Sequence, residues 1–344
     1  MKKNKSLRRL LFVLCWPAAL HAQIFGPSDR TGEYPGMSAR LPGQGTEENA
    51  QIAAEPLWRQ ALGGSVIGLP AVQVQSVVVA LDSGNIKAYS SGGRPLWTYN
   101  AGGRIGPHVS RSREGTCYLS RTSGVFIAVN RAGRELWRRS PGAPLSGPAV
   151  PGWDGRIFVP TGKRLSCYTN SGNLLWRREF DSPMALQPRL GRKGGLLTVL
   201  ENGELLFIDP FGGIAGYRLS AVPRTVIPAG GPGEDRALVL YPSGAVELID
   251  PESPGRRPSV LPRLPAPPLS AEGRGNQAAV LMEDGGVILL SGEDGSFLWT
   301  GKSHIGGAGA ETAMICDERG VYVLSRSGAA GFTAGGRRLW FIRL

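Results

Sequence analysis

The stretch LDSGNIKAYSSGGRPLW, residues 81–97, is one copy of a unit that recurs along most of the chain. Counterparts of its final tryptophan, Trp97, follow a regular spacing; they are Trp58, Trp137, Trp176, Trp299 and Trp340. The successive steps from the first to the last are 39, 40, 39, 123 and 41 residues, and 123 is three steps of 41. The two positions without tryptophan fall near Tyr217 and Arg257. A period of about 40 residues made of short strands is typical of a β-propeller, in which each repeat is one four-stranded blade.

Each copy contains apolar strands and ends with a turn and an outer strand. In the copy that ends at Trp97, residues 76–81 (SVVVAL) form an unbroken apolar run of strand length. Such a run suits a strand buried on both faces, as in a blade packed between two neighbours. A glycine lies four residues before the repeated aromatic in most copies, where a turn needs a positive φ that other residues resist. These glycines are Gly93, Gly133, Gly172, Gly213, Gly295 and Gly336.

A proline 10 to 12 residues after each tryptophan position is a second periodic mark. Proline is tolerated at the first residue of a strand, where no ladder donor is lost, so we expect it to open each inner strand. The prolines are Pro70, Pro107, Pro148, Pro188, Pro228 and Pro268, with Ala310 in the last copy.

The two marks together predict an all-β fold, a β-propeller of four-stranded antiparallel blades, and the copies from Pro70 to Trp340 number seven. Trp58 heads a spare outer strand in residues 55–62 (EPLWRQAL). We expect this terminal strand to close the ring. An eighth blade, of which it is the surviving strand, stays open as the alternative.

The N-terminal residues predict export. Residues 1–22 combine five Lys and Arg with a short apolar run and end at Ala22, as a secretory signal does. Acylation at Cys15, as in a lipoprotein, is the alternative. Residues 23–54 are rich in Gly, Pro and polar residues and are expected to form a flexible lead, followed by a single propeller domain in residues 55–344. The expected location is the periplasm or the periplasmic face of the outer membrane.

Charge limits the classes of partner. The formal net charge of +12 falls to +7 without residues 1–22, because five basic and no acidic residues leave with them. A moderately basic surface attracts acidic proteins, anionic lipid or cell-wall polymer, so peripheral membrane association is compatible with it. Nucleic acid is not expected as a partner of an exported protein, and we expect a monomer.

The sequence predicts no metal site, cofactor or catalytic residue. Cys117, Cys167 and Cys316 are an odd set in strand-like segments, so we expect small buried residues rather than a disulfide framework. No Cys-x-x-Cys pair and no Cys/His metal spacing occurs in the chain.

The Leu-Trp tail that follows each turn glycine, the Ala-Leu-Asp or Ala-Val-Asn strand end and the proline-led inner strand resemble the quinoprotein-type (PQQ-like) propeller repeat over residues 55–344. The resemblance implies that the repeated tryptophans pack between adjacent blades. It is less specific for activity, since one fold hosts many functions. Quinone-dependent dehydrogenases of this kind are longer, hold calcium with acidic and amide side chains and often carry a vicinal Cys pair, which this chain lacks.

The chain is also similar in size, repeat and export signal to the BamB family, the propeller subunits of the outer-membrane β-barrel assembly machinery. This resemblance implies a non-catalytic exported scaffold that binds envelope proteins, with the outer-membrane barrel-assembly complex as the expected partner. Two alternatives stay open. One is an enzyme like the PQQ- and calcium-dependent dehydrogenases, and the other is a propeller that binds envelope polysaccharide through basic loops such as 102–104.

Partner contacts are expected where the repeat fails. Residues 251–269 contain seven prolines and no tryptophan, so they must form an edge strand or an exposed extended loop. Trp153 lies off the repeat phase in the turn-like stretch PGWDGRIF. The candidate partner-binding residues are Trp153, Arg256, Arg257, Leu261, Arg263 and Leu264.

Overall fold

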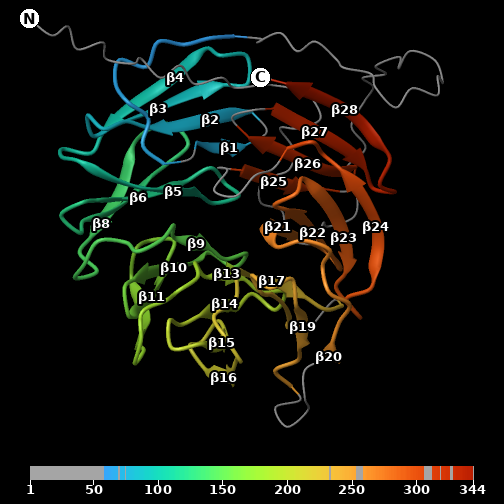
Figure 1. Ribbon diagram of the computed structural model, residues 1–344. Coiled ribbons are helices and arrows are strands. Elements are labelled where there is room, and N and C mark those ends of the chain that lie inside the picture. The colour runs from blue at the N-terminus through green and yellow to red at the C-terminus, as the bar shows by residue number, and fades with distance from the viewer. Residues whose placement is uncertain are drawn as a thin grey trace, which may run out of the picture.

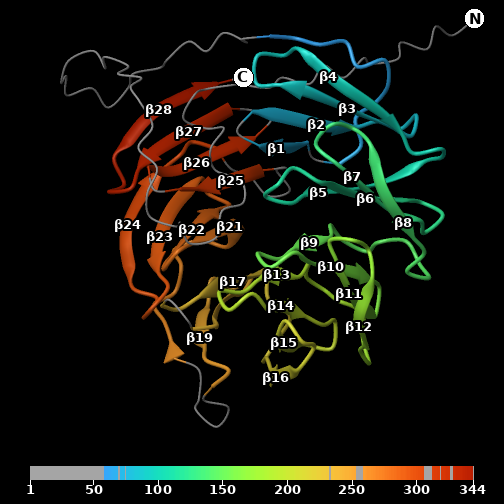
Figure 2. The same cartoon turned by 180° about the vertical axis from the view of Figure 1, so that it is seen from behind.

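A computed structural model of the chain describes residues 58–68, 70–73, 75–231, 234–252, 259–305, 312–317, 319–325 and 328–343. The described strands form seven four-stranded antiparallel sheets, and each sheet uses four strands that are consecutive in the sequence. Figures 1 and 2 show these sheets arranged around a common centre, with the first strand of each innermost. The predicted all-β propeller of seven four-stranded blades is therefore confirmed. The described residues include no helix that could cross a membrane.

The blades follow chain order, and their strands run from the centre outward. Blade 1 comprises β1 (Ala71–Gln73), β2 (Ser76–Ala80), β3 (Asn85–Ser90) and β4 (Pro95–Asn100). Blade 2 comprises β5 (Ile105–Arg111), β6 (Cys117–Arg121), β7 (Phe126–Val129) and β8 (Glu135–Arg139). Blade 3 comprises β9 (Val150–Pro151), β10 (Arg156–Thr161), β11 (Arg164–Thr169) and β12 (Leu174–Glu179). Blade 4 comprises β13 (Arg189–Leu190), β14 (Leu196–Val199), β15 (Glu204–Ile208) and β16 (Ile214–Arg218).

The remaining three blades keep the same order. Blade 5 comprises β17 (Thr225–Ala229), β18 (Arg236–Leu240), β19 (Val246–Ile249) and β20 (Ser259–Val260). Blade 6 comprises β21 (Pro268–Arg274), β22 (Gln277–Met282), β23 (Gly286–Ser291) and β24 (Phe297–Lys302). Blade 7 comprises β25 (Thr312–Cys316), β26 (Gly320–Ser325), β27 (Gly328–Thr333) and β28 (Arg338–Arg343).

The hydrophobic core lies between neighbouring blades. At the junction of blades 2 and 3, Phe126 and Trp137 pack with Ile157 and Val159 of the next blade, and all four side chains are buried. The second strand of each blade is buried on both faces for this reason, as the apolar run of residues 76–81 predicts. Burying one such side chain contributes roughly 1.5–3 kcal/mol, so these junctions are the main source of stability.

The repeated tryptophans fasten each blade to the next one. Five of them donate an Nε1 hydrogen bond to a backbone carbonyl in the turn before the next outer strand, with N to O distances of 2.7 to 2.9 Å. The bonds run from Trp58 to Ser91, Trp97 to Arg131, Trp137 to Asn170, Trp176 to Pro210 and Trp299 to Ala334. Each ring lies over the turn glycine of that blade, where a Cβ atom would lie 3.0 Å or less from the ring. We call this arrangement the interblade clasp.

A polar side chain two residues after the tryptophan strengthens three of the clasps. Arg139 Nε donates to the Gly172 carbonyl over 2.6 Å and Arg178 Nε to the Gly212 carbonyl over 2.8 Å. Gln60 Nε2 donates to the Gly93 carbonyl over 3.0 Å. The same turn thus receives an indole and a second donor from the preceding blade.

Blade 4 departs from the register that the sequence predicts. In its ladder Phe207 pairs with Ala215, whereas the corresponding Cys167 of blade 3 pairs with Trp176, so Ala215, and not Tyr217, occupies the tryptophan position. The positive φ of 86° belongs to Gly212 and not to Gly213. The two predicted positions are wrong because β15 and β16 pair without the bulge that shifts β4, β8, β12, β24 and β28 by one residue.

Trp58 lies against blade 1 as the outer strand of a preceding blade would. The side chains of Trp58 and Gln60 both donate hydrogen bonds to backbone carbonyls in the turn before β4. Blade 7 has four strands of its own, and residues 58–62 form no ladder with it among the described residues. Closure of the ring by the terminal strand therefore stays a prediction.

The described cysteines are all buried, as predicted. Burial raises the pKa of the Cys117 and Cys167 thiols to about 11 and that of Cys316 to about 12. The neighbouring Arg111 opposes part of this rise at Cys117. At pH 8 we expect Ellman's reagent to leave the three thiols unreacted in the folded protein and to react with all of them in guanidinium chloride.

The raised thiol pKa values also predict a stability that depends on pH. An unfolded thiol ionises near pH 8.5, whereas the folded ones stay protonated until about pH 11. The folded state therefore binds protons more tightly, and its stability is full below pH 8.5 and falls as the pH rises toward 11. A variant with all three cysteines replaced by alanine should lose less stability between pH 8.5 and 10.5 in urea titrations. An equal loss in both proteins would refute the assignment.

Candidate functional site

Exposed apolar side chains gather on blades 3 and 4. In the described part of the chain ten large hydrophobic residues are exposed, and five of them lie in residues 153–214; they are Trp153, Leu174, Leu175, Phe211 and Ile214. In the outer strands of blades 1, 2, 6 and 7, the large hydrophobic residue found exposed is the leucine before the tryptophan. Contiguous exposed apolar area on a soluble protein marks an interaction surface more often than isolated leucines do.

We define the blade 3–4 surface as Trp153, Arg156, Leu175, Phe211 and Ile214. Trp153 stands in the turn between β9 and β10 and is 48% exposed. The turn is fixed by a Gly152 N–H bond to the Arg156 carbonyl over 2.7 Å. Trp153 is therefore held on a hydrogen-bonded turn with about half of its surface exposed to solvent.

Phe211 is 74% exposed, more than any other large apolar side chain among the described residues. It stands in the turn between β15 and β16, where the Asp209 carboxylate accepts the Phe211 N–H over 2.7 Å and the Gly213 N–H over 2.9 Å. The Arg156 guanidinium of blade 3 lies 5.0 Å from the centre of the Phe211 ring. This cation–π contact joins the two blades at the surface and orients the ring.

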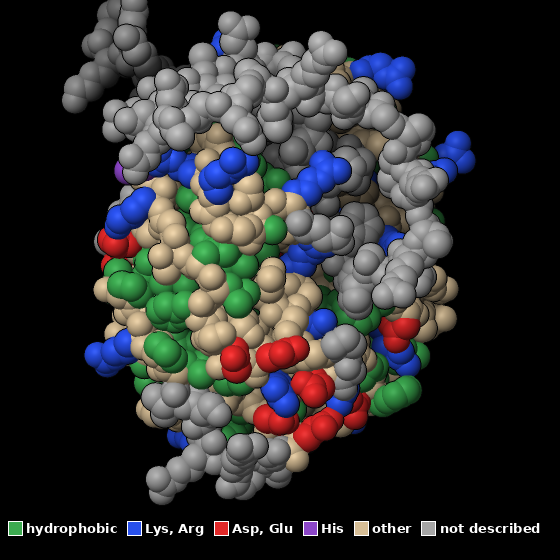
Figure 3. All heavy atoms as spheres, turned by 90° about the vertical axis from the view of Figure 1, so that its right-hand side faces the viewer, with side chains coloured by type: hydrophobic (Ala, Val, Ile, Leu, Met, Phe, Trp, Pro, Cys, Tyr) green, Lys and Arg blue, Asp and Glu red, His purple; other side chains and the backbone are tan. Residues whose placement is uncertain are grey.

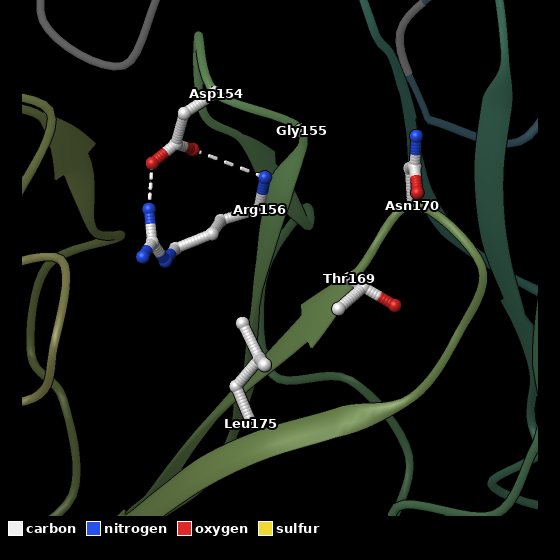
Figure 4. Close-up of a pocket in the computed structure, with 6 residues that line it drawn as sticks. All are labelled: Asp154, Gly155, Arg156, Thr169, Asn170 and Leu175. Atoms are coloured by element: carbon white, nitrogen blue, oxygen red, sulfur yellow. Dashed lines mark hydrogen bonds and ion pairs between the residues drawn. The ribbon is translucent and has the colours of Figure 1, made fainter.

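Arg156 also lines a shallow hollow on blade 3. Figure 4 shows this hollow with Asp154, Gly155, Arg156, Thr169, Asn170 and Leu175 around it. Asp154 forms an ion pair with Arg156 and accepts its backbone N–H over 3.1 Å. The paired charges cancel locally, so the hollow offers amide and hydroxyl groups beside an exposed leucine rather than a net charge. Among the described residues no group of three His, Cys, Asp or Glu side chains could hold a metal ion.

Basic and acidic residues are distributed unevenly among the blades. Residues 58–224, which contain blades 1 to 4, include 21 Lys and Arg but nine Asp and Glu. Residues 225–305, which contain blades 5 and 6, include six Lys and Arg but ten Asp and Glu. Figure 3 views the molecule from the right-hand side of Figure 1 and shows acidic side chains gathered on the lower part of that side. The blade 3–4 surface thus belongs to the basic part of the chain, which favours acidic partners.

The structure shows which of the candidate partner-binding residues are exposed and which are buried. Trp153 is exposed as expected, and Arg263 is exposed as well. Leu264 is only 5% exposed, and its N–H donates to the Gly244 carbonyl over 2.9 Å, so its side chain packs in the core and not at the surface. Leu261 is partly buried over Gly295, in the place that a tryptophan takes in the five interblade clasps, so its packing is also structural. Arg256 and Arg257 lie outside the described residues.

Phe211 and Arg156 are surface residues that the sequence analysis missed. Phe211 follows Asp209-Pro210 and precedes Gly212-Gly213, so a large apolar residue interrupts a stretch otherwise typical of a turn. That interruption was the available signal. The role of Arg156 depends on its contact with Phe211 in the next blade. The sequence of one repeat does not indicate which residues of the next blade it will contact.

Comparison with known proteins identifies a related family model over part of the chain. Residues 121–215 match the family model PQQ_2, described as outer membrane protein assembly factor BamB. The matched range contains Trp153, Arg156, Leu175, Phe211 and Ile214. No curated protein matches the sequence.

Solved structures confirm the fold. BamB from Moraxella catarrhalis superposes with a TM-score of 0.58 at 18% identity, over 80% of this chain and 84% of that one. The computationally designed Ika8 protein superposes with a TM-score of 0.63 at 12% identity, over 80% and 86%. These findings confirm the predicted resemblance to a PQQ-like propeller of the BamB type. At such identities the structural likeness shows the fold alone.

Proposed function

We propose that this chain is a non-catalytic, exported scaffold that binds proteins of the cell envelope and serves outer-membrane protein assembly. The observation that carries the proposal is the blade 3–4 surface, which lies wholly within the segment similar to BamB. A propeller of this type is compatible with a protein-interaction role, because it presents rigid turns and outer strands around a stable core.

The composition of the surface supports a protein partner. Tryptophan, phenylalanine and arginine are enriched where binding energy concentrates at protein interfaces. Trp153 and Arg156 of blade 3 and Phe211 of blade 4 supply these three types, and the cation–π contact preorganises two of them. A partner that covers them would gain apolar burial without reordering the backbone.

Capture from envelopes tests the proposal. The tagged protein, crosslinked in intact cells, is expected to recover the barrel-assembly core. A double variant with Trp153→Ala and Phe211→Ala should recover at least tenfold less while melting within about 2 °C of the parent, because both side chains are exposed. Leu298→Ala on blade 6 is the matched control, since Leu298 is 47% exposed and lies away from this surface. Repeated absence of the barrel-assembly core from the parent sample would contradict the proposal.

The non-catalytic part of the proposal has its own test. With calcium and pyrroloquinoline quinone added, we expect no saturable quinone binding by fluorescence quenching and no dye reduction with alcohols or sugars as substrates. Saturable binding together with calcium-dependent dye reduction would instead favour the dehydrogenase alternative.

A further inference from the structure

The outer strand of a propeller blade has one edge that its own sheet leaves unpaired. Such an edge is a template for another strand, and proteins commonly protect it with bulges or charges. The ladders that join β4, β8, β12, β24 and β28 to their third strands all contain a bulge beside the tryptophan position. The ladder of β15 and β16 runs through five consecutive pairs without one. Among these six outer strands, β16 alone has a regular edge.

The residues of β16 add no other protection. Its sequence is Ile-Ala-Gly-Tyr-Arg, so the first charged side chain is Arg218 at its end. Ile214, Ala215 and Gly216 are all exposed. The equivalent stretches of β8 and β12 carry Arg138 and Arg177 next to their tryptophans. A neutral, exposed and unbulged edge is what strand addition requires.

The hydrogen bonds at the two ends of β16 show which backbone groups face outward. The Asp209 N–H donates to the Gly213 carbonyl and the Leu219 N–H to the Gly203 carbonyl, both over 2.9 Å. Residues 213 and 219 therefore face β15, and because antiparallel pairing alternates, residues 215 and 217 face it too. The N–H and C=O groups of Ile214, Gly216 and Arg218 consequently point toward the free edge.

We propose that β16 accepts an extended segment of a partner protein as a fifth strand of blade 4. The partner segment carries apolar side chains at alternate positions, which pack beside Ile214 and Phe211. It also carries an acidic residue near Arg218, in keeping with the basic half of the propeller. This inference rests on the proposed scaffold function and names the chemistry of its partner. Nascent β-strands of outer-membrane proteins have the required alternation of apolar and polar residues.

The test uses a fluorescent ten-residue peptide in which valine or phenylalanine alternates with threonine or glutamate. A second peptide of the same sequence is N-methylated at every other residue, which removes the donors that a strand ladder needs but keeps the side chains. Fluorescence anisotropy should show saturable binding of the first peptide and at least tenfold weaker binding of the second. Equal binding of the two peptides, or no binding of the first, would overturn the proposal.

Matched variants locate the site. Gly216→Lys places a charge on the β16 edge, where the Cβ atom meets only the flexible end of Glu204. Thr300→Lys is the control, because Thr300 lies three residues before Ser303, whose N–H donates to Gly285 as that of Leu219 donates to Gly203. We expect Gly216→Lys to weaken peptide binding at least tenfold and Thr300→Lys to leave it unchanged, with both variants melting like the parent. Equal weakening by both variants would refute β16 as the site.

The outcomes separate this inference from the function on which it rests. If the parent captures the barrel-assembly core but the peptide does not bind, strand addition is wrong and the scaffold proposal stands. If the peptide binds at β16 but no barrel-assembly subunit is captured, the edge is real and the proposed envelope role is wrong.

Discussion

Replacing Trp137 by alanine is expected to lower the free energy of unfolding by about 3–5 kcal/mol, the range for truncating a buried aromatic side chain. The indole is 8% exposed and packs with Phe126 and Tyr118 of its own blade. Its Nε1 donates to the Asn170 carbonyl over 2.7 Å. The variant would leave a cavity between blades 2 and 3 and an unsatisfied carbonyl in the turn of blade 3.

Urea denaturation followed by circular dichroism measures this loss. Trp153→Ala removes a side chain of the same type that is 48% exposed and outside the interblade clasp, so it should change stability by less than about 0.5 kcal/mol. Similar losses in the two variants would show that the clasp does not hold the blades together.

The second large effect is expected at Gly93, where alanine should cost about 2–4 kcal/mol. The Gly93 φ is 81°, a conformation that alanine adopts only with strain. A Cβ atom there would lie 2.5 Å from Cγ of Trp58, so the indole of the first clasp must also move. The adjacent Gly92 is the matched control, because its nearest contact would be Ser90 Oγ at 3.9 Å. Gly92→Ala should be neutral within about 0.5 kcal/mol.

A double-mutant cycle separates the two parts of this cost. In a Trp58→Ala background the steric part disappears and the strain of the positive φ stays, so Gly93→Ala should cost about 1–2 kcal/mol there. An unchanged cost in that background would mean that Trp58 does not pack on blade 1. The cycle thus tests whether residues upstream of blade 1 contribute to the ring.

The sequence predicted those features for which a position in the blade accepts only one type of residue. Gly93 is needed for a positive φ and Trp97 for the clasp over the next turn, so both recur with the period of the blade. The same reasoning placed Tyr217 at the tryptophan position of blade 4 and was wrong there. The β15–β16 ladder lacks a bulge, and no residue type in the sequence indicates that absence. The burial of Leu264 was not apparent from the sequence for a related reason, since its neighbours are rich in proline, which is typical of an exposed segment.

The candidate site could be predicted only in part. Trp153 was identified because it lies off the repeat phase, and its exposure follows from the turn that contains it. The contribution of Phe211 depends on Arg156, which reaches it from the preceding blade. Such a contact arises from how two repeats meet in space, and the sequence of one repeat does not contain that information.

A photo-crosslinking amino acid at position 211 tests the central claim most directly, which is that the blade 3–4 surface binds an envelope protein. Phe211 is 74% exposed, so benzoylphenylalanine can replace it without disturbing the core, and position 298 on blade 6 serves as the exposed control. Irradiation of intact cells should give a crosslinked species with a barrel-assembly subunit from position 211 and none from position 298. The claim would be contradicted by adducts of equal yield at both positions, or by the absence of any adduct at position 211.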